Sequence, residues 1–84
     1  KNLTPAEAKK FGYDKPCVIV MSVERDSAAA RTGLEPYDII IKVGNAEITT
    51  ISDFNREAAK FSLKEGIPLT VLDSTGMHAV ELKE

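Results

Sequence analysis

The sequence predicts an α+β fold, a small and partly open β-barrel or sandwich of about five strands with two to three short helices. Short apolar runs rich in β-branched residues recur along the chain and alternate with segments that begin with helix-capping residues. Turn-forming residues separate the last two runs closely enough for a hairpin. With 84 residues, of which 43% are hydrophobic, the chain suits one modest core. We therefore expect a single domain over residues 1–84.

The N-terminal part predicts one helix and one strand. Thr4-Pro-Ala-Glu7 is a capping-box pattern with proline at the first helical position, and Gly12 after Phe11 is a natural stop. These signals indicate a helix of about two turns. The nearly continuous apolar run at 17–23 then predicts a central strand.

The segment 26–48 condenses a short helix, a turn and a buried strand. Ser27 is a good N-cap for the alanine-rich stretch that follows, and Gly33 lies where a short helix needs a left-handed residue to stop. Pro36 favours a turn. The β-branched run 39–41 then predicts a strand buried on both faces, and Gly44-Asn45 predicts a tight reversal into a short partner strand at 46–48.

The C-terminal part predicts the longest helix and a hairpin. Residues 50–52 supply caps before a helix at 53–63, whose Phe54, Ala58 and Phe61 recur at helical spacing and should face the core. Gly66 should end this helix. The strands 68–73 and 77–82 then pair across Ser74-Thr-Gly76, with Val80 and Leu82 on one face.

Composition and residue inventory exclude several functions. A net charge of −2 offers no basic surface for nucleic acid, and no apolar run approaches the ~18 residues of a transmembrane helix. The sole histidine, His78, follows a turn containing Ser74, and this pairing is more typical of exposed hairpin positions than of a nucleophile and its base. Cys17, the sole cysteine, is best interpreted as a core residue. We expect no catalytic residues, no metal site and no cofactor.

The segment 27–48 resembles the PDZ domains of bacterial Do-like (high-temperature-requirement, trypsin-like) serine proteases. The similarity rests on Ser27, Ala29, Ala30, Gly33, Leu34, Pro36, Asp38, Ile39, Ile40, Val43 and Ile48. The chain departs from the family pattern at Tyr37, where glycine is usual, at Ala28, where proline is common, and at Gly44-Asn45, which reverses the usual Asn-Gly. The Leu-Thr-Pro helix also resembles an element of these modules, so the resemblance covers nearly the whole chain and implies the circularly permuted bacterial arrangement.

The resemblance implies recognition of an extended peptide, which adds as a strand to a sheet edge beside helix 53–63. If Phe54, Ala58 and Phe61 face the core, the adjacent face presents Ile51, Asn55, Ala59 and Ser62 as candidate peptide-binding residues. Alanines there would leave room for a bulky ligand side chain. Asn55 and Ser62 are equally well interpreted as solvated helix positions.

One family feature is missing from the sequence. The carboxylate-binding loop, a Gly-Leu-Gly-Phe-like or Tyr-Leu-Gly-Val-like segment, should precede the first helix, but Lys1-Asn-Leu3 stands there instead. Either the domain is truncated in its N-terminal strand or this member lacks the loop. In both cases we expect weak binding of free carboxyl termini.

Three functions remain open. The first is a substrate-recognition or regulatory module of an envelope serine endopeptidase, which implies a bacterial periplasm or cell envelope. Its partners would be peptides or unfolded segments, including carboxyl termini, and a neighbouring protease domain, without membrane insertion. The second is a PDZ module of a carboxy-terminal processing protease, a site-two metalloprotease or a secretion component. The third is a structural docking domain with a closed groove.

Overall fold

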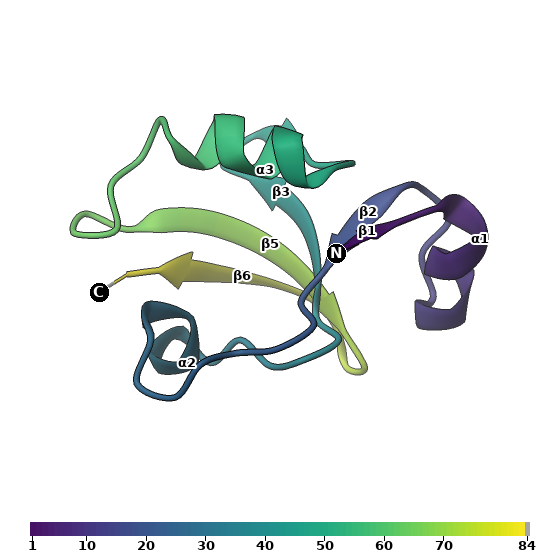
Figure 1. Ribbon diagram of the computed structural model, residues 1–84, viewed down its shortest axis with the longest axis horizontal. Coiled ribbons are helices and arrows are strands. Elements are labelled where there is room, and N and C mark those ends of the chain that lie inside the picture. Colours follow the sequence, from purple (N-terminus) through teal and green to yellow (C-terminus); the bar gives the residue numbers. More distant parts are fainter. Residues whose placement is uncertain (84) are drawn as a thin grey trace.

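A computed structural model describes residues 1–83 and confirms an α+β fold built on one antiparallel sheet (Figure 1). The strands are hydrogen-bonded in the order β1-β2-β3-β5-β6, and β4 pairs with β3. In chain order the elements are β1 (Asn2–Leu3), α1 (Pro5–Ala8), the 3₁₀ helix η1 (Lys9–Phe11), β2 (Cys17–Ile19), α2 (Ala28–Thr32), β3 (Ile39–Val43), β4 (Ala46–Glu47), α3 (Ile51–Ala58), β5 (Ile67–Asp73) and β6 (Gly76–Leu82).

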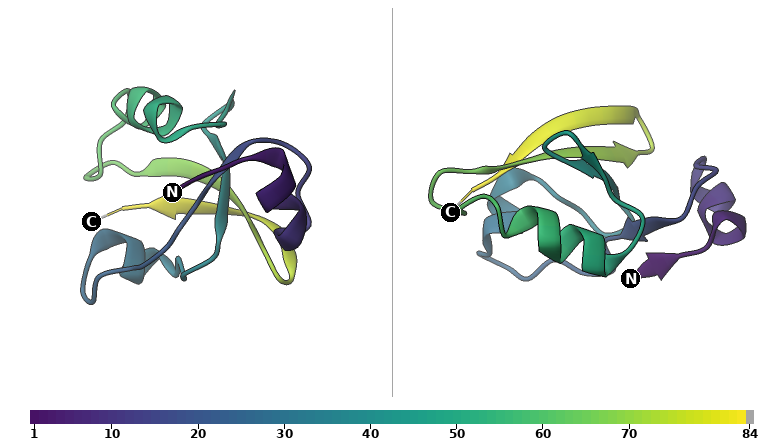
Figure 2. Two further views of the ribbon diagram at one scale, coloured as in Figure 1. Left: turned by 45° about the vertical axis from the view of Figure 1, so that its right-hand side comes forward. Right: turned by 90° about the horizontal axis from the view of Figure 1, so that it is seen from above.

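The helices lie at three separate places around this sheet. Helix α3 packs against β3, α2 against β6, and α1 against β1. Figure 2 shows the sheet strongly curved, with α3 and α2 on opposite sides of the β5–β6 hairpin and α1 at the far end. Each helix covers a different part of the sheet. Neither α3 nor α2 covers the part of the sheet that lies between them.

The predicted burial of β3 on both faces is confirmed. Ile39, Ile40 and Ile41 are all buried, although they point alternately to opposite faces. Ile40 and Val43 belong to a first core with Val18, Leu34, Ile48, Ile67, Leu69 and Val71, whereas Ile39 and Ile41 belong to a second core with Leu3, Ala8, Cys17 and Ile19. Strand β3 is therefore the wall that both cores share.

A register shift between Ile40 and Lys42 allows β3 to serve both cores. Ile40 pairs with Val71 of β5 and Lys42 with the next residue, Thr70, so Ile41 is an extra residue in β3. Strict alternation would place Val43 on the face of Ile41, but Val43 lies in the first core with Ile40. The irregularity thus returns the end of β3 to the first core and leaves Lys42 exposed.

The predicted starts of the first two helices and the predicted hairpin turn are confirmed. Thr4 Oγ1 accepts a hydrogen bond from Glu7 N at 3.2 Å, and Glu7 Oε1 accepts one from Thr4 N at 3.1 Å, which completes the capping box. Ser27 caps α2, which ends at Gly33 with φ of 94°. The β5–β6 hairpin closes over Ser74 and Thr75 as expected.

Two predicted elements were too long. Strand β2 covers Cys17–Ile19 rather than 17–23. The helix expected at 53–63 is α3 at Ile51–Ala58, which begins two residues earlier at the Thr50 cap. Its last turn tightens through bonds from Lys60 N to Glu57 O and from Phe61 N to Ala58 O.

The early end of α3 changes the position of Phe61. Its ring is 40% exposed and lies 3.1 Å from where a Cβ on Gly44 would stand. The prediction that Phe61 faces the core from a helix is therefore wrong, whereas Phe54 and Ala58 do pack against the first core. Gly44, with φ of 60°, supplies both the turn conformation and the space for this ring.

No helix within residues 1–83 combines the length and apolar composition that crossing a bilayer requires.

The hydrogen bonds at the start of α3 predict how the stability of the fold depends on pH. Asp53 Oδ2 accepts hydrogen bonds from Thr49 Oγ1 at 2.6 Å and Thr49 N at 3.1 Å, and Arg56 lies against its other oxygen. These bonds, chiefly those from Thr49, lower the pKa of Asp53 below its ordinary value. The stabilisation that ionised Asp53 gives the folded state is thus complete above its unfolded-state pKa of about 3.9. It is lost as the pH falls through the lower folded-state pKa.

Urea unfolding measured from pH 6 down to pH 2.5 should show this loss. Asp53→Asn should flatten the acid limb of the stability curve, whereas Asp14→Asn, which changes an exposed carboxylate outside this network, should leave it unchanged. An equal loss of unfolding free energy at acid pH in the parent and in Asp53→Asn would contradict the stabilising role given to ionised Asp53.

Candidate functional site

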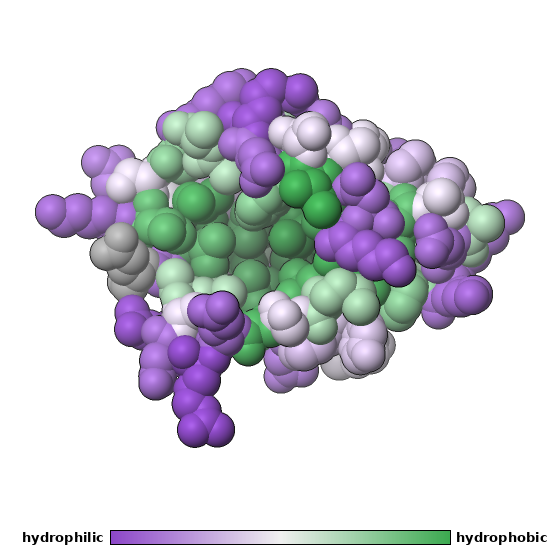
Figure 3. All heavy atoms as spheres, viewed as in Figure 1, coloured by the Kyte–Doolittle hydropathy of each residue, from purple (hydrophilic) through white to green (hydrophobic). Residues whose placement is uncertain are grey.

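Apolar side chains gather in a hollow between α3 and α2. Figure 3 shows this hollow below α3 and above the loop that leads into α2, with hydrophilic side chains on both rims. Val71 and Leu69 of β5 belong to the core beneath. Half-buried apolar side chains pack around that core from several elements: Val20, Val23, Ala29, Phe54, Ala58, Val80 and Leu82. The hollow therefore presents an apolar surface to solvent, which is the kind of surface that binds apolar groups.

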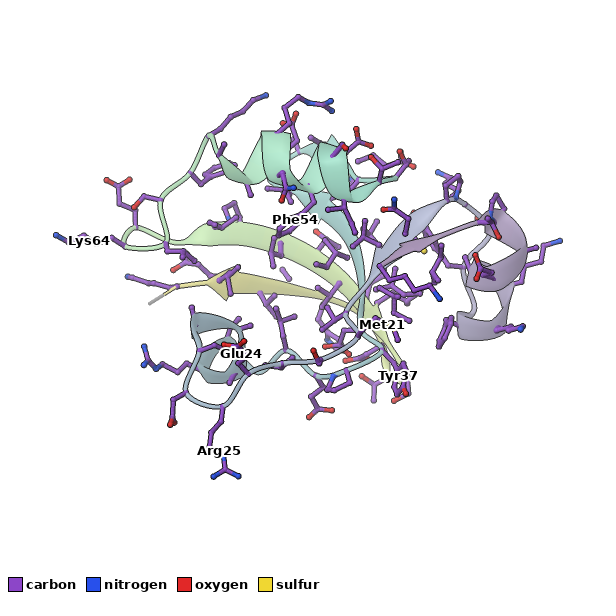
Figure 4. All side chains as sticks on the ribbon, in the orientation of Figure 1. Met21, Glu24, Arg25, Tyr37, Phe54 and Lys64 are labelled. Atoms are coloured by element: carbon purple, nitrogen blue, oxygen red, sulfur yellow. The ribbon has the colours of Figure 1, made fainter. Side chains whose placement is uncertain are left out.

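Helix α3 forms one wall of the hollow and has two different sides. Phe54 points from α3 toward β5 in Figure 4, and Ala58 lies one turn further along the same side. The other side is held by ion pairs from Arg56 to Asp53 and Glu57, both at 3.1 Å, and from Lys60 to Glu57 at 2.9 Å. Lys60 and Arg56 lower the pKa of Glu57. The charges of α3 are thus largely paired within the helix, and its inner side is left apolar.

A sheet edge lies beside this wall at β1. Lys1 O accepts a hydrogen bond from Ile19 N at 2.8 Å, and Leu3 pairs with Cys17. Because backbone groups alternate along an antiparallel strand, the N–H and C=O of Asn2 point away from β2. Asn2 Oδ1 accepts a hydrogen bond from Ile51 N at 2.7 Å, so this side chain joins β1 to the first turn of α3.

The outer edge of β1 faces α3. An extended segment that paired with the outward N–H and C=O of Asn2 would lie between β1 and α3, alongside the hollow.

The four predicted site residues are not all on one helix face. Ile51 is 40% exposed at the start of α3, and Asn55 is exposed one turn later. Ala59 is the exposed C-cap. Ser62 lies beyond α3, where Ser62 O accepts a hydrogen bond from Gly66 N and Ser62 Oγ accepts one from Lys64 N, so its expected helical position is wrong.

Sequence reasoning missed Asn2 and the floor of the hollow. A two-residue strand carries almost no periodic signal, so nothing marked Asn2 as the contact to α3. The floor was detectable in part, because Leu69 and Val71 alternate with more exposed residues along β5. Their role depends on α3 and α2 leaving that face uncovered, which is a tertiary property.

The only histidine belongs to a turn network. His78 Nε2 lies 2.7 Å from Thr75 Oγ1 and 3.2 Å from Asp73 Oδ1, and Thr75 Oγ1 donates to the same Asp73 oxygen at 2.7 Å. These contacts, led by those from Thr75, lower the pKa of Asp73. A base oriented for nucleophilic catalysis uses one ring nitrogen for the nucleophile and the other for the carboxylate. Here both partners meet one nitrogen, so the cluster is suited to holding the hairpin turn.

The comparisons with known proteins agree with this architecture. The PDZ domain family matches residues 3–83. Relatives from Chlamydia pneumoniae and Chlamydia muridarum, each named a probable periplasmic serine endoprotease DegP-like, are 35% and 32% identical over 85 residues. A third with the same name, from Chlamydia trachomatis, is 29% identical. Each alignment covers 99% of this chain but only 17% of the relative.

The contact between Asn2 and Ile51 generates a testable prediction. In Asn2→Ala the Ile51 amide loses its acceptor, so its hydrogen exchange should accelerate by about 3- to 10-fold, corresponding to one hydrogen bond of ~0.5–1.5 kcal/mol. Asn45→Ala, which removes an exposed asparagine from the β3–β4 turn, serves as the matched control. Unchanged exchange at Ile51 in Asn2→Ala would show that β1 is not joined to α3 in solution.

Proposed function

The chain belongs to the PDZ domain family, and from that membership we propose that it is a peptide-recognition module of a bacterial envelope serine endoprotease. The observation that supports this most strongly is the apolar hollow beside α3 together with the outer edge of β1, which Asn2 joins to α3. Strand addition requires such a pairing edge together with a recess for alternate side chains. In this proposal the module binds and positions peptides and takes no part in peptide-bond cleavage.

The peptide would lie extended between α3 and the outer edge of β1. Its main chain would hydrogen-bond to this edge, which gives affinity for many sequences, and every second side chain would enter the hollow. Along the helix the peptide would meet Ile51, Asn55 and Ala59, with Ser62 just beyond the C-terminal end. Because Phe54 and Ala58 line the recess, aliphatic or aromatic ligand side chains would be preferred.

The parent protein enters this proposal through the relatives. Their printed name is that of a periplasmic serine endoprotease, and the chain spans 17% of their length. We propose a parent of the same kind, located in the periplasm or cell envelope, whose protease domain lies outside residues 1–84. The module would then bring unfolded segments or carboxyl termini to that domain or regulate it. The identity to these relatives favours such a parent over a processing protease, a metalloprotease or a secretion component.

One observation favours a second function, that of a docking domain with a closed groove. The Asn2 side chain bonds to Ile51 N and fills the gap between β1 and the first turn of α3. A peptide passing that point would have to displace this 2.7 Å hydrogen bond or stop short of it. The Asn2→Ala variant separates the two functions. Its Kd for the peptide should fall if the Asn2 side chain only obstructs a binding groove, and should not change if the groove does not bind peptides.

Peptide titration followed by NMR tests the proposed groove. A ¹⁵N-labelled protein titrated with an extended apolar peptide should show shift changes along Asn2, Ile51 and Asn55. Asn55→Trp, which fills the space beside α3, should raise the Kd by about 10-fold. Arg56→Trp, on the ion-paired side of the helix, should stay within about twofold of the parent. Equal effects of the two tryptophans would contradict the assigned groove.

The terminal carboxylate of the ligand is expected to add little. Carboxylate capture needs several convergent backbone N–H groups, and the sequence has no segment of the Gly-Leu-Gly-Phe type before α1. Peptides ending in a free acid or an amide should therefore bind this chain with Kd values within about threefold of each other. Tight binding of the acid alone would show that another part of the chain supplies the carboxylate site.

A further inference from the structure

Strand β6 ends the sheet, and its outer edge has no neighbouring strand within residues 1–83. It is the last strand in the order β1-β2-β3-β5-β6, and it pairs with β5 continuously from Gly76 to Leu82. Figure 2 shows it on the outside of the β5–β6 hairpin. An outer edge of this kind carries backbone N–H and C=O groups that can pair with another strand.

The hydrogen bonds around β5 show which way the backbone of β6 points. Pro68 O accepts a hydrogen bond from Gly44 N at 2.8 Å, so the backbone of Pro68 points toward β3 and away from β6. Its partner in β6, Glu81, must then point away from β5. In agreement, Glu81 O accepts a hydrogen bond from Thr32 Oγ1 of α2 at 3.1 Å. The backbone of Glu81 thus faces the outer edge, where α2 occupies its carbonyl.

Two other residues of β6 face the same edge with their backbone groups free. Because backbone direction alternates along a strand, the N–H and C=O of Ala79 and Met77 point outward like those of Glu81. No strand or side chain within residues 1–83 bonds to these outward groups. Met77 is 61% exposed, and Ala79 is exposed as well. The two residues therefore offer two unpaired donors and two unpaired acceptors to a further strand.

Helix α2 limits the length of this free edge. It packs against β6, and its bond from Thr32 reaches the strand at Glu81. Figure 1 shows α2 beside the C-terminal half of β6, whereas no helix lies beside the half next to the hairpin turn. The edge available to an added strand is therefore residues 76–80, which we call the free edge.

The free edge lacks the features that usually protect an outer strand from pairing. Natural edge strands are guarded by lysine and other charged side chains, by proline or by a bulge. The segment Gly76-Met-His-Ala-Val80 contains no Lys, Arg, Asp, Glu or Pro, and its register with β5 is unbroken. The composition of the free edge thus favours pairing with another strand.

The free edge is complementary to a second copy of itself. Antiparallel pairing about a twofold axis at His78 places Met77 opposite Ala79 of the second copy, and the reverse. All outward N–H and C=O groups of these two residues are then bonded on both copies. The facing side chains also match in size, because Met77 lies opposite Ala79 and Val80 lies opposite Gly76.

The contact with α2 selects this register. If the twofold axis lay one residue later, at Ala79, Met77 would have to pair with Glu81 of the second copy. The carbonyl of Glu81 already bonds to Thr32, and α2 stands beside it. The axis at His78 is therefore the register that uses free groups alone.

We propose that the free edge of β6 is a self-association surface, through which two copies of this chain join their β5–β6 hairpins into one antiparallel sheet. So short a contact buries little surface, so the dimer should be weak, with a Kd on the order of 10⁻⁴ M. This association goes beyond the proposed peptide groove and does not depend on it, because β1 supplies the edge of that groove.

Concentration dependence tests the pairing directly. In sedimentation equilibrium from about 20 µM to about 2 mM, the average mass should rise from that of a monomer toward that of a dimer. In ¹⁵N spectra over the same range, amide shifts should move more at Met77 and Ala79 than at His78 and Val80. The N–H groups of the latter two point to β5 and are already bonded within the hairpin.

A charge exchange at the twofold axis tests the register. Residue 78 of each copy would lie opposite its counterpart, with Cβ atoms about 5 Å apart. His78→Lys alone and His78→Glu alone place like charges there, so each should raise the dimer Kd at least about 10-fold. An equimolar mixture of the two should form a heterodimer at least as tight as the parent dimer. This rescue separates lost pairing from the loss of the His78 contacts in the hairpin turn.

Two substitutions at Ala79 form a matched pair. Ala79→Pro removes an outward N–H without touching the hydrogen bonds to β5, so it should raise the dimer Kd at least about 10-fold. Its urea unfolding midpoint should show that the fold is retained. Ala79→Ser also changes the side chain but keeps the N–H, so its dimer Kd should stay within about twofold of the parent.

The proposal is overturned if the chain sediments as a monomer at about 2 mM, if Ala79→Pro associates as tightly as Ala79→Ser, or if the mixed charge variants fail to associate. It is also overturned if an apolar peptide pairs with Met77 and Ala79 while the chain stays monomeric, because the edge would then serve a foreign strand. Peptide binding beside α3 should be unchanged in Ala79→Pro, so the peptide groove and the self-association can fail separately.

Discussion

The rest of the structure depends on a single strand, β3, being buried on both faces. Ile39 and Ile41 complete one core and Ile40 and Val43 the other, so two apolar layers are built on five residues. An 84-residue chain buries a limited fraction of its surface, and a shared central strand lets it form two cores from few side chains. The extra residue at Ile41 is what makes the sharing possible, because it moves Val43 back to the first core.

The candidate binding surface is a consequence of this arrangement. Three short helices cover different parts of a curved sheet, and none of them covers the whole of either core. The first core is left open between α3 and α2, where apolar side chains form the hollow. The hollow is therefore an extension of the first core, which gives it a rigid support.

The sequence was most predictive where local chemistry decides the structure. The Thr4 capping box, the Ser27 cap, the stop at Gly33 and the β5–β6 turn each depend on a few neighbouring residues, and all are confirmed. It was less predictive where distant residues decide. The position of Phe61 depends on Gly44, which is distant from it in sequence. The candidate site combines both kinds of residue: Ile51 and Asn55 follow from helix spacing, whereas the contact from Asn2 to α3 requires the folded chain.

The position of the bound peptide in the hollow is the central claim, and isotope-filtered NOE spectroscopy of the complex measures it most directly. With ¹³C-labelled protein and an unlabelled apolar peptide, we expect intermolecular NOEs from a ligand side chain to Phe54, Ala58 and Val80, which border the hollow. Main-chain contacts should lie along β1 at Asn2. NOEs confined to the charged side of α3, or to the outer face of β6 at Met77, would show that the hollow is not the peptide site.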